Sequence, residues 1–397
     1  MPTGTVLHPD FRCLDGELYS SACIVAGCWI ELSGEIGPAV QGCPVQGQTD
    51  DDYHRAGEAS NVDKLPLPEP FSGGILLSYK CTSRCRHCLY ACSPSWKGDW
   101  LSLADAEAIL SQLAAKLRGK YPDSAGVGVN QGIHFTGGEP FLNFDLLLEV
   151  TAIAQRLGIP STFVETNCVW CTDDKTTREK LTRLKTAGLQ GILISANPFV
   201  VEYVPFARIQ RAVRISAEVF RGNVMVYQQF FYEQFRRMGL RDTLPFEEYL
   251  QKAGEGLYHA ELLPGGRVAY RLGDLFKTYP AEHFFGASCR RELIRDWHIH
   301  VDNYCNFVPG YCAGISLGDA RALDEMCKGI DLDQLPIVRA LLTSLEELYR
   351  LGTEFGYQER SGYVSKCHLC FDIRRHLVQV GEFKELKPTQ LYQHLEE

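Results

Sequence analysis

The feature that most constrains this chain is a group of three cysteines, Cys81, Cys85 and Cys88, with the spacing C-x3-C-x2-C. They directly follow an apolar run, 75–79, which is typical of a buried strand. A cubane iron–sulfur cluster has four irons and is usually held by four thiolates, so three local thiolates leave one iron open to a non-protein ligand. The spacing therefore predicts an iron–sulfur cluster with an open iron.

Two alternatives to this cluster stay open. Cys92 follows shortly after the motif and is available as a fourth thiolate, which would make the loop similar to that of a fully ligated, ferredoxin-like cluster. The second alternative is zinc, although structural zinc usually takes two pairs of ligands and this loop contains one C-x2-C pair.

Composition excludes several classes of protein. The 397 residues carry 40 basic and 49 acidic side chains, and this net charge of −9 argues against nucleic acid or an anionic membrane as the main partner. No apolar run is long enough to span a membrane, and the first residues do not resemble a secretion signal, so we expect a cytoplasmic protein. In that reducing compartment, clustered cysteines more often bind metal than form disulfides.

The chain divides into three predicted parts. Residues 1–65 form a Cys- and Gly-rich segment with little periodicity, and the alternating prolines of 65–70 predict a stiff, extended connector. Residues 71–255 form the core, and 256–397 form a less regular C-terminal domain with six cysteines and one long amphipathic stretch, 335–351.

The core alternates between apolar runs typical of strands and amphipathic runs typical of helices. This alternation predicts an α/β fold with a parallel sheet, in which binding sites form at the carboxyl ends of the strands. Ser102 is the expected N-cap of the first helix, and Gly188 is expected to end the third. The expected strands are 75–79, 132–136, 161–166, 191–195 and 223–227, and the expected helices are 103–117, 144–157, 176–187 and 207–220.

Polar and glycine residues follow the strands in this order. The second strand ends in Thr136-Gly137-Gly138-Glu139-Pro140, the third in Glu165-Thr166-Asn167 and the fourth in Ser195-Ala196-Asn197. Together with the cysteine motif, these segments resemble the radical SAM superfamily over roughly residues 73–255. In that comparison His87 stands where the family usually has an aromatic residue, and the glycine motif is similar to the family's GGEP motif.

The resemblance implies a partial (β/α)6 barrel and a [4Fe-4S] cluster whose open iron binds S-adenosylmethionine (SAM). Reductive cleavage of SAM would give methionine and a 5′-deoxyadenosyl radical, which abstracts hydrogen from a substrate. The expected cluster ligands are Cys81, Cys85 and Cys88. The residues expected to contact SAM are His87, Gly137, Gly138, Glu139, Pro140, Glu165, Asn167, Ser195 and Asn197. His134, within the second strand, is interpreted as a core histidine.

The C-terminal cysteines are similar in layout to the auxiliary-cluster domains, called SPASM or twitch, that follow many radical SAM cores. Cys289, Cys305, Cys367 and Cys370 are the favoured ligands of one auxiliary [4Fe-4S] cluster, and Cys312 is the main rival. The family's glycine before the second cysteine is absent, and Asp302-Asn303-Tyr304 stands in its place. Too few cysteines are present for two auxiliary clusters, so a one-cluster, twitch-like domain fits better. Zinc at the same site is the alternative.

Besides Cys327 in the C-terminal domain, six other cysteines have no assigned role. Four lie in the N-terminal segment, where both metal binding and buried thiols stay open. The pair Cys168 and Cys171 forms another C-x2-C after the third strand, and the sequence leaves open whether it acts with Cys92, binds a cluster or only forms a turn. The N-terminal four are Cys13, Cys23, Cys28 and Cys43.

Two classes of function follow from these patterns. The leading prediction is a radical SAM enzyme that acts on a peptide or small molecule and takes electrons from a protein such as ferredoxin or flavodoxin. The opposing class is an electron-transfer protein with fully ligated clusters, which would not cleave SAM. Within the enzyme class, activation of a glycyl-radical enzyme is a further alternative. The sequence has no segment typical of cobalamin binding.

Overall fold

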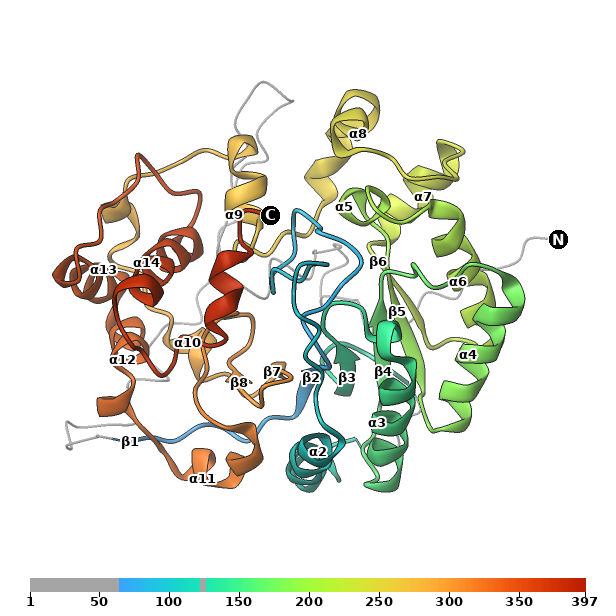
Figure 1. Cartoon of the computed structure of the whole chain (residues 1–397), viewed down its shortest axis with the longest axis horizontal. Helices are drawn as coiled ribbons and strands as arrows, with labels where there is room; N and C mark the ends of the chain where they lie inside the picture. The colour runs from blue at the N-terminus through green and yellow to red at the C-terminus, as the bar shows by residue number, and fades with distance from the viewer. Residues whose placement is uncertain (1–63, 122–125) are drawn as a thin grey trace, which may run out of the picture.

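A computed structural model describes residues 64–121 and 126–397. Its centre is a sheet with the strand order β6-β5-β4-β3-β2-β7-β8 (Figure 1). Six neighbouring strands, β6 through β7, are parallel, and only β8 is antiparallel. The strands are β2 (Ser72–Leu76), β3 (Gly132–Thr136), β4 (Phe163–Thr166), β5 (Gly191–Ser195), β6 (Val224–Tyr227), β7 (Ile299–Val301) and β8 (Phe307–Val308).

Four amphipathic helices follow the first strands and pack beside one another in chain order, each burying its apolar face (Figure 1). They are α2 (Leu103–Leu117), α3 (Phe144–Arg156), α4 (Asp174–Thr186) and α6 (Phe206–Phe220). Ser102, Asn143 and Asp173 cap the first three through side-chain oxygens that accept backbone N–H groups. The predicted parallel α/β architecture of a partial radical SAM barrel is therefore confirmed.

The sixth parallel strand lies on an unexpected side of the sheet. A (β/α)6 pattern would add it beside β6, whereas β7 pairs with β2, at the opposite edge of the five preceding parallel strands. The segment 297–304 belongs to the predicted C-terminal domain, 256–397, which follows the core in sequence. Only β7 forms there, and it extends the core sheet because its residues 299–301 pair in parallel with 73–75.

The first strand begins earlier than its apolar pattern indicates. Gly73 and Gly74 carry no apolar side chain, but both lie inside β2. A Cβ atom on Gly73 would lie 2.6 Å from the carbonyl oxygen of Ile299, so glycine is what allows β7 to approach so closely.

Apart from α14, the remaining elements are shorter than the four core helices, and most of them lie around the carboxyl ends of the strands or in the C-terminal part of the molecule (Figure 1). The expected single amphipathic stretch 335–351 is two helices, because Ser344 is extended and caps the second one. These other helices and strands are β1 (Lys64–Leu65), α5 (Pro198–Val201), α7 (Gln229–Arg237), α8 (Phe246–Ala253), α9 (Val268–Arg271), α10 (Arg290–Leu293), α11 (Leu323–Lys328), β9 (Ile330–Asp331), α12 (Pro336–Thr343), α13 (Leu345–Glu354) and α14 (Lys366–Val380). The 3-10 helices are η3 (Pro140–Asn143), η4 (Gly254–His259), η5 (Gly273–Leu275), η6 (Ala281–Phe284), η7 (Ala320–Ala322), η8 (Leu332–Gln334) and η9 (Thr389–Gln393).

The predicted connector before the core is extended and partly buried. β1 pairs antiparallel with β9, and Leu65 and Leu67 are buried. The division of the chain at 65, 71 and 255 stays a prediction. Among the described residues, no helix combines the length and apolar character that crossing a membrane requires.

Candidate functional site

The three motif cysteines lie in the loop that leaves the carboxyl end of β2. The Cys81 and Cys88 thiols both act electrostatically on Cys85, and Cys88 also acts on Cys81, so the loop brings all three together. Burial raises the pKa of the Cys81 thiol to about 12 and that of Cys85 well above its ordinary value. Burial of this kind disfavours the charged thiolate. A buried cysteine therefore ionises only when its sulfur binds a positive centre, such as a cluster iron.

Cys88 differs from the other two, and Cys92 is the reason. A hydrogen bond with the Cys92 thiol, together with the positive charge of Arg267, lowers the pKa of Cys88 to about 6. The Cys92 backbone N–H donates to Cys88 Sγ at 3.3 Å, and the Cys92 side chain is buried. Cys92 thus lies beside the motif, and a fourth thiolate ligand remains an alternative.

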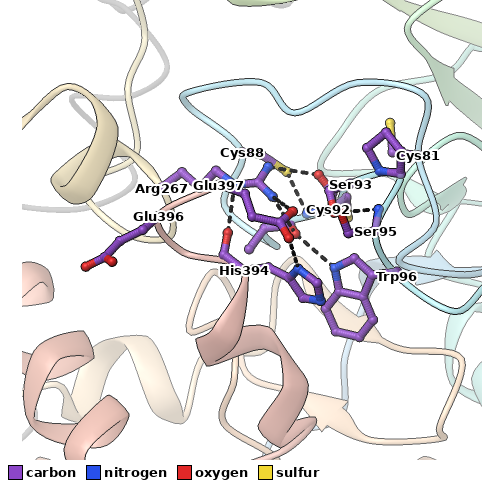
Figure 2. Close-up of polar contacts among 12 residues, drawn as sticks. Cys81, Cys88, Cys92, Ser93, Ser95, Trp96, Arg267, His394, Glu396 and Glu397 are labelled. Atoms are coloured by element: carbon purple, nitrogen blue, oxygen red, sulfur yellow. Dashed lines mark hydrogen bonds and ion pairs between the residues drawn. The ribbon is translucent and has the colours of Figure 1, made fainter.

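Arg267 is a functional residue that the sequence does not reveal. Its guanidinium is fully buried behind the cysteine loop and donates to the backbone carbonyls of Ala91, Cys92 and His394 at 2.8–2.9 Å (Figure 2). Its charge lowers the pKa values of Cys85, Cys88 and Cys92. Because Arg267 lies 175 residues from Cys92 in the chain, no local pattern links them.

Two arginines, Arg84 and Arg86, lie within the cysteine loop itself, and Arg86 forms ion pairs with residues outside the loop. Arg86 pairs with Glu202 at 3.0 Å and with Glu247 at 2.7 Å. Arg267, rather than Arg84 or Arg86, is therefore the cation whose charge acts on Cys85 and Cys88.

The glycine motif packs against the cysteine loop. The Gly138 N–H donates to the Ser78 carbonyl at 2.8 Å, and the Glu139 N–H donates to the Lys80 carbonyl at 3.0 Å. A Cβ on Gly137, whose φ is +131°, would lie 2.3 Å from Ser78 O, and one on Gly138 would lie 1.9 Å from Lys80 O. The sequence-based reason for these glycines was the approach of a ligand. The structure gives another reason, which is contact between two backbone segments.

Glu139 braces this junction. Its buried carboxylate accepts the Asn167 N–H at 2.9 Å, the Phe141 N–H at 3.1 Å and the Thr166 hydroxyl at 3.0 Å. Burial raises its pKa to about 7. Pro140 is the first residue of η3, which Glu139 caps.

Two of the amides expected near SAM lie at the cysteine loop. Asn167 Nδ2 donates to Thr82 Oγ1 at 3.1 Å and lies 3.7 Å from Cys81 Sγ. Asn197 Nδ2 lies 3.3 Å from His87 Nε2, and Asn197 also caps α5. The His87 ring stacks on Phe199, while its buried Nδ1 has no hydrogen-bond partner within residues 64–121 and 126–397.

Ser195 and Glu165 occupy the ends of β5 and β4, respectively, but Glu165 is oriented differently from the amides. Its Oε2 accepts the Thr136 hydroxyl at 2.6 Å, and its Oε1 lies 3.5 Å from His134 Nε2. His134, His298 and His300 form a buried group beside it. Burial lowers the pKa of His134 and His298 to about 3 and that of His300 well below its ordinary value, so all three rings are neutral at pH 7.

The C-terminal cysteines meet at a second place. Cys289, Cys312, Cys367 and Cys370 line one cavity of about 60 Å³, which also touches Leu89 directly after the cysteine motif. Cys305 lies elsewhere, with Asp105, Asp319 and Arg321 as its charged neighbours. Its place in the expected ligand set is therefore corrected: Cys312, the rival, lies with the other three. Cys305 points away because β7, which precedes it, belongs to the core sheet.

Two arginines that line this cavity, the buried Arg374 and the half-buried Arg295, have buried nitrogen atoms with unused hydrogen-bond donors. Arg295 Nε and Nη1 and Arg374 Nε have no hydrogen-bond partner in the described part of the chain. Buried, unpaired cationic donors are costly, so the cavity fits a negatively charged occupant.

The other cysteines separate into two groups. Cys168 and Cys171 are fully buried and hydrogen-bonded to each other, whereas Cys92 bonds to Cys88. The structure therefore does not place Cys168 and Cys171 in one site with Cys92. The N-terminal four cysteines lie outside the described residues.

Several solved structures are similar to the chain at low identity. BtrN in complex with AdoMet and 2-DOIA is 13% identical, with a TM-score of 0.35, and the match covers 69% of this chain and 88% of that one. Native anSMEcpe with bound AdoMet is 11% identical, with a TM-score of 0.37, and the match covers 82% and 96%. Streptococcus suis SuiB bound to its precursor peptide SuiA is 14% identical, with a TM-score of 0.32 and 71% of each chain covered. No curated protein sequence matches significantly.

The assignment rests on a match to a protein family. Residues 75–218 match the model of the Radical SAM superfamily, and this range holds the cysteine motif, the glycine motif and strands β3 to β5. The matched residues include the cysteine loop and the glycine motif, which lie together at the carboxyl ends of the parallel strands. Residues 75–218 therefore form a radical SAM domain, and the chain that carries this domain is an enzyme.

Proposed function

We propose that Cys81, Cys85 and Cys88 hold a [4Fe-4S] cluster at which the enzyme reductively cleaves SAM, so that the resulting radical abstracts hydrogen from a substrate. The observation that carries this proposal is the convergence of three thiols with the Gly137–Gly138 backbone and Asn167 at the carboxyl ends of β2, β3 and β4. A low-potential donor such as ferredoxin or flavodoxin would supply the electron.

The residues present fit this group. The bound cluster would supply one-electron reduction of SAM, which no protein side chain provides. The buried Arg267 guanidinium would offset the negative charge of the three thiolates. Asn167 and the Glu139 brace hold the carboxyl end of β4 against Cys81 and Thr82, and the unpartnered Nδ1 of His87 supplies a buried polar atom beside Cys88.

We further propose one auxiliary iron–sulfur cluster, held by Cys289, Cys312, Cys367 and Cys370. Four thiols around one cavity are the donor set that such a cluster requires, and the orphaned donors of Arg295 and Arg374 would balance its charge. With all four positions occupied by protein, this cluster would serve electron transfer rather than substrate binding. Oxidation of the substrate, with one electron passed to this cluster, is the reaction that such an arrangement favours.

The first prediction tests SAM cleavage. Anaerobic protein with reconstituted clusters should form 5′-deoxyadenosine under a strong reductant, and the Cys81/Cys85/Cys88→Ala variant should lose this activity because it lacks the thiolates. Cys327→Ala, which removes a half-buried thiol outside both groups, is the matched control and should keep full activity. Product formation is followed by liquid chromatography with mass spectrometry.

Cys92→Ala distinguishes the two forms of the cluster. An open iron predicts that this variant still cleaves SAM. Absence of cleavage in the wild type, together with loss of iron from Cys92→Ala, would instead indicate a fully ligated, electron-transfer cluster. Undiminished cleavage in the triple variant would contradict the enzyme proposal.

A further inference from the structure

Three buried histidines meet across strand β2. His134 lies on β3 and His300 on β7, and both are in register with Gly74 of β2, which lies between them. His298 directly precedes β7, and its ring centroid lies 5.2 Å from that of His134 and 4.8 Å from that of His300. One nitrogen of each ring lies within 4.8 Å of the others. The interpretation of His134 as an ordinary core histidine did not include these neighbours.

Gly74 makes room for this group. A Cβ on Gly74 would lie 2.3 Å from His134 Nε2 and 2.6 Å from His300 Cδ2. Any other residue at the centre of β2 would push the rings apart. His298 also adopts a φ of +55°, a left-handed conformation that costs free energy for a non-glycine residue and is concentrated at functional sites.

Hydrogen bonds fix which ring nitrogen carries the proton. His298 Nδ1 lies 2.9 Å from the carbonyl oxygen of Val129, and His300 Nδ1 lies 2.9 Å from that of Gly310. A carbonyl oxygen only accepts, so both Nδ1 atoms carry hydrogen, and in a neutral ring Nε2 then has the free lone pair. This is the arrangement in which metal-binding histidines are usually held.

Glu165 completes the group with a carboxylate. Its Oε1 lies 3.5 Å from His134 Nε2, while its Oε2 is fixed by the Thr136 hydroxyl. Two ligand atoms on one tetrahedral zinc ion lie roughly 3.3–3.5 Å apart, given metal–ligand bonds of about 2.0–2.1 Å. The other ring nitrogens need to approach by about 1 Å to reach this geometry. The Glu165 side chain is 28% exposed, so an ion has a route to the site.

We propose that His134, His298, His300 and Glu165 bind one divalent transition-metal ion, with zinc as the metal that suits them. Three imidazoles and a carboxylate are a donor set that proteins use for zinc, and the site contains no thiol that would favour an iron–sulfur cluster. The ion would lie beside Tyr90, whose ring centroid is 5.2 Å from that of His300 and whose buried hydroxyl has no hydrogen-bond partner in the part of the chain that the structure describes.

The test measures zinc in protein whose iron–sulfur clusters are loaded, so that the cysteines are occupied. Zinc ion alone is the probe, followed by elemental analysis and zinc X-ray absorption. We expect about one zinc per chain, with a nitrogen and oxygen shell and the outer scattering of imidazole rings. His298→Gln and His134→Gln should abolish stoichiometric binding, and Glu165→Gln should weaken it roughly 10- to 100-fold. His376→Gln, which alters a half-buried histidine bonded to Phe355 O, is the matched control.

The outcomes separate this proposal from that of SAM cleavage, because the readout is metal content and ligand type. The proposal would be overturned if the wild-type protein with its iron–sulfur clusters in place bound no zinc, or if the bound zinc were surrounded by sulfur atoms. Wild-type affinity in a folded His298→Gln or Glu165→Gln variant would do the same. If the histidine variants fail to fold, the absorption spectrum of the wild-type protein still decides.

Discussion

Gly138 shows how one missing side chain positions the cysteine loop. We expect Gly138→Ala to displace the backbone at Lys80 and Cys81, since its Cβ would lie 1.9 Å from Lys80 O and 2.8 Å from Cys81 N. Overpacking of this kind costs about 1–3 kcal/mol, so the melting temperature should fall together with the iron bound at the motif. Circular dichroism melts and iron analysis are the measurements. Gly222→Ala, which meets no atom within 4 Å, is the control. Unchanged iron and stability in Gly138→Ala would contradict the backbone explanation.

Arg267 acts at the same scale through both hydrogen bonds and charge. Arg267→Met leaves three buried carbonyl oxygens without their donor, each at a cost of about 1–3 kcal/mol, so we expect a marked loss of stability. It also removes the positive charge that favours the thiolates of Cys85 and Cys88. The reduction potential of the motif cluster should therefore fall, because the more negative reduced state loses its compensation.

Arg267→Lys separates these two effects. Lysine keeps the charge but not the planar fork that reaches Ala91, Cys92 and His394. We expect the potential, followed by electron paramagnetic resonance during redox titration, to stay near the wild-type value while the melting temperature drops. Equal potentials in the Met and wild-type proteins would show that the charge of Arg267 does not act on the cluster.

At the scale of elements, α12 depends on a carboxylate from a distant segment. The helix has no side-chain cap of its own, and the Ile337 N–H donates to Glu385 Oε1 at 2.7 Å. The other oxygen, Oε2, is buried and has no hydrogen-bond partner among the described residues. Burial raises the pKa of Glu385 above its ordinary value of 4.5, despite this hydrogen bond.

This raised pKa predicts a pH dependence. The folded protein holds the Glu385 proton more tightly than the unfolded chain does, so stability from this group is lost as the pH rises from 4.5 through the raised pKa. Glu385→Gln cannot ionise and keeps a carbonyl oxygen for Ile337. The melting temperature of the wild type relative to this variant should fall over that pH range. Parallel curves for the two proteins would contradict the prediction.

At the scale of the whole molecule, the cavity of the proposed auxiliary cluster joins segments that are distant in the chain. Cys289 precedes α10, Cys312 follows β8, and Cys367 and Cys370 lie on α14. Leu89 from the motif loop also lines the cavity, so this site adjoins the radical SAM domain. Metal binding at such a junction contributes directly to folding free energy.

We predict that Cys312→Ala and Cys305→Ala differ in their effects. In protein that already carries the Cys81/Cys85/Cys88→Ala substitutions, Cys312→Ala should remove the remaining iron and lower the melting temperature. Cys305→Ala should keep the iron, because Cys305 lies with Asp105 and Arg321. Iron analysis and Mössbauer spectra check both variants. Loss of iron only in Cys305→Ala would restore the ligand set expected from spacing.

Local patterns were sufficient for most of the core. The bounds of α2, β3 and β5 are those expected, as is the Ser102 cap, because periodicity and capping act over a few neighbouring residues. The cysteine and glycine motifs could be found for the same reason: each is a short segment whose residue types carry its chemistry. The start of β2 was missed, since Gly73 and Gly74 give no apolar signal.

The sequence by itself determined the radical SAM domain and the motif that would hold its cluster. Tertiary structure decided which distant residues join it: Arg267 behind the cysteine loop, Cys312 in place of Cys305, and His298 and His300 beside His134. All three depend on where the C-terminal third of the chain returns to the core, above all on β7 pairing with β2. Such a return is set by the packing of many side chains across the molecule, and no spacing within a short segment encodes it.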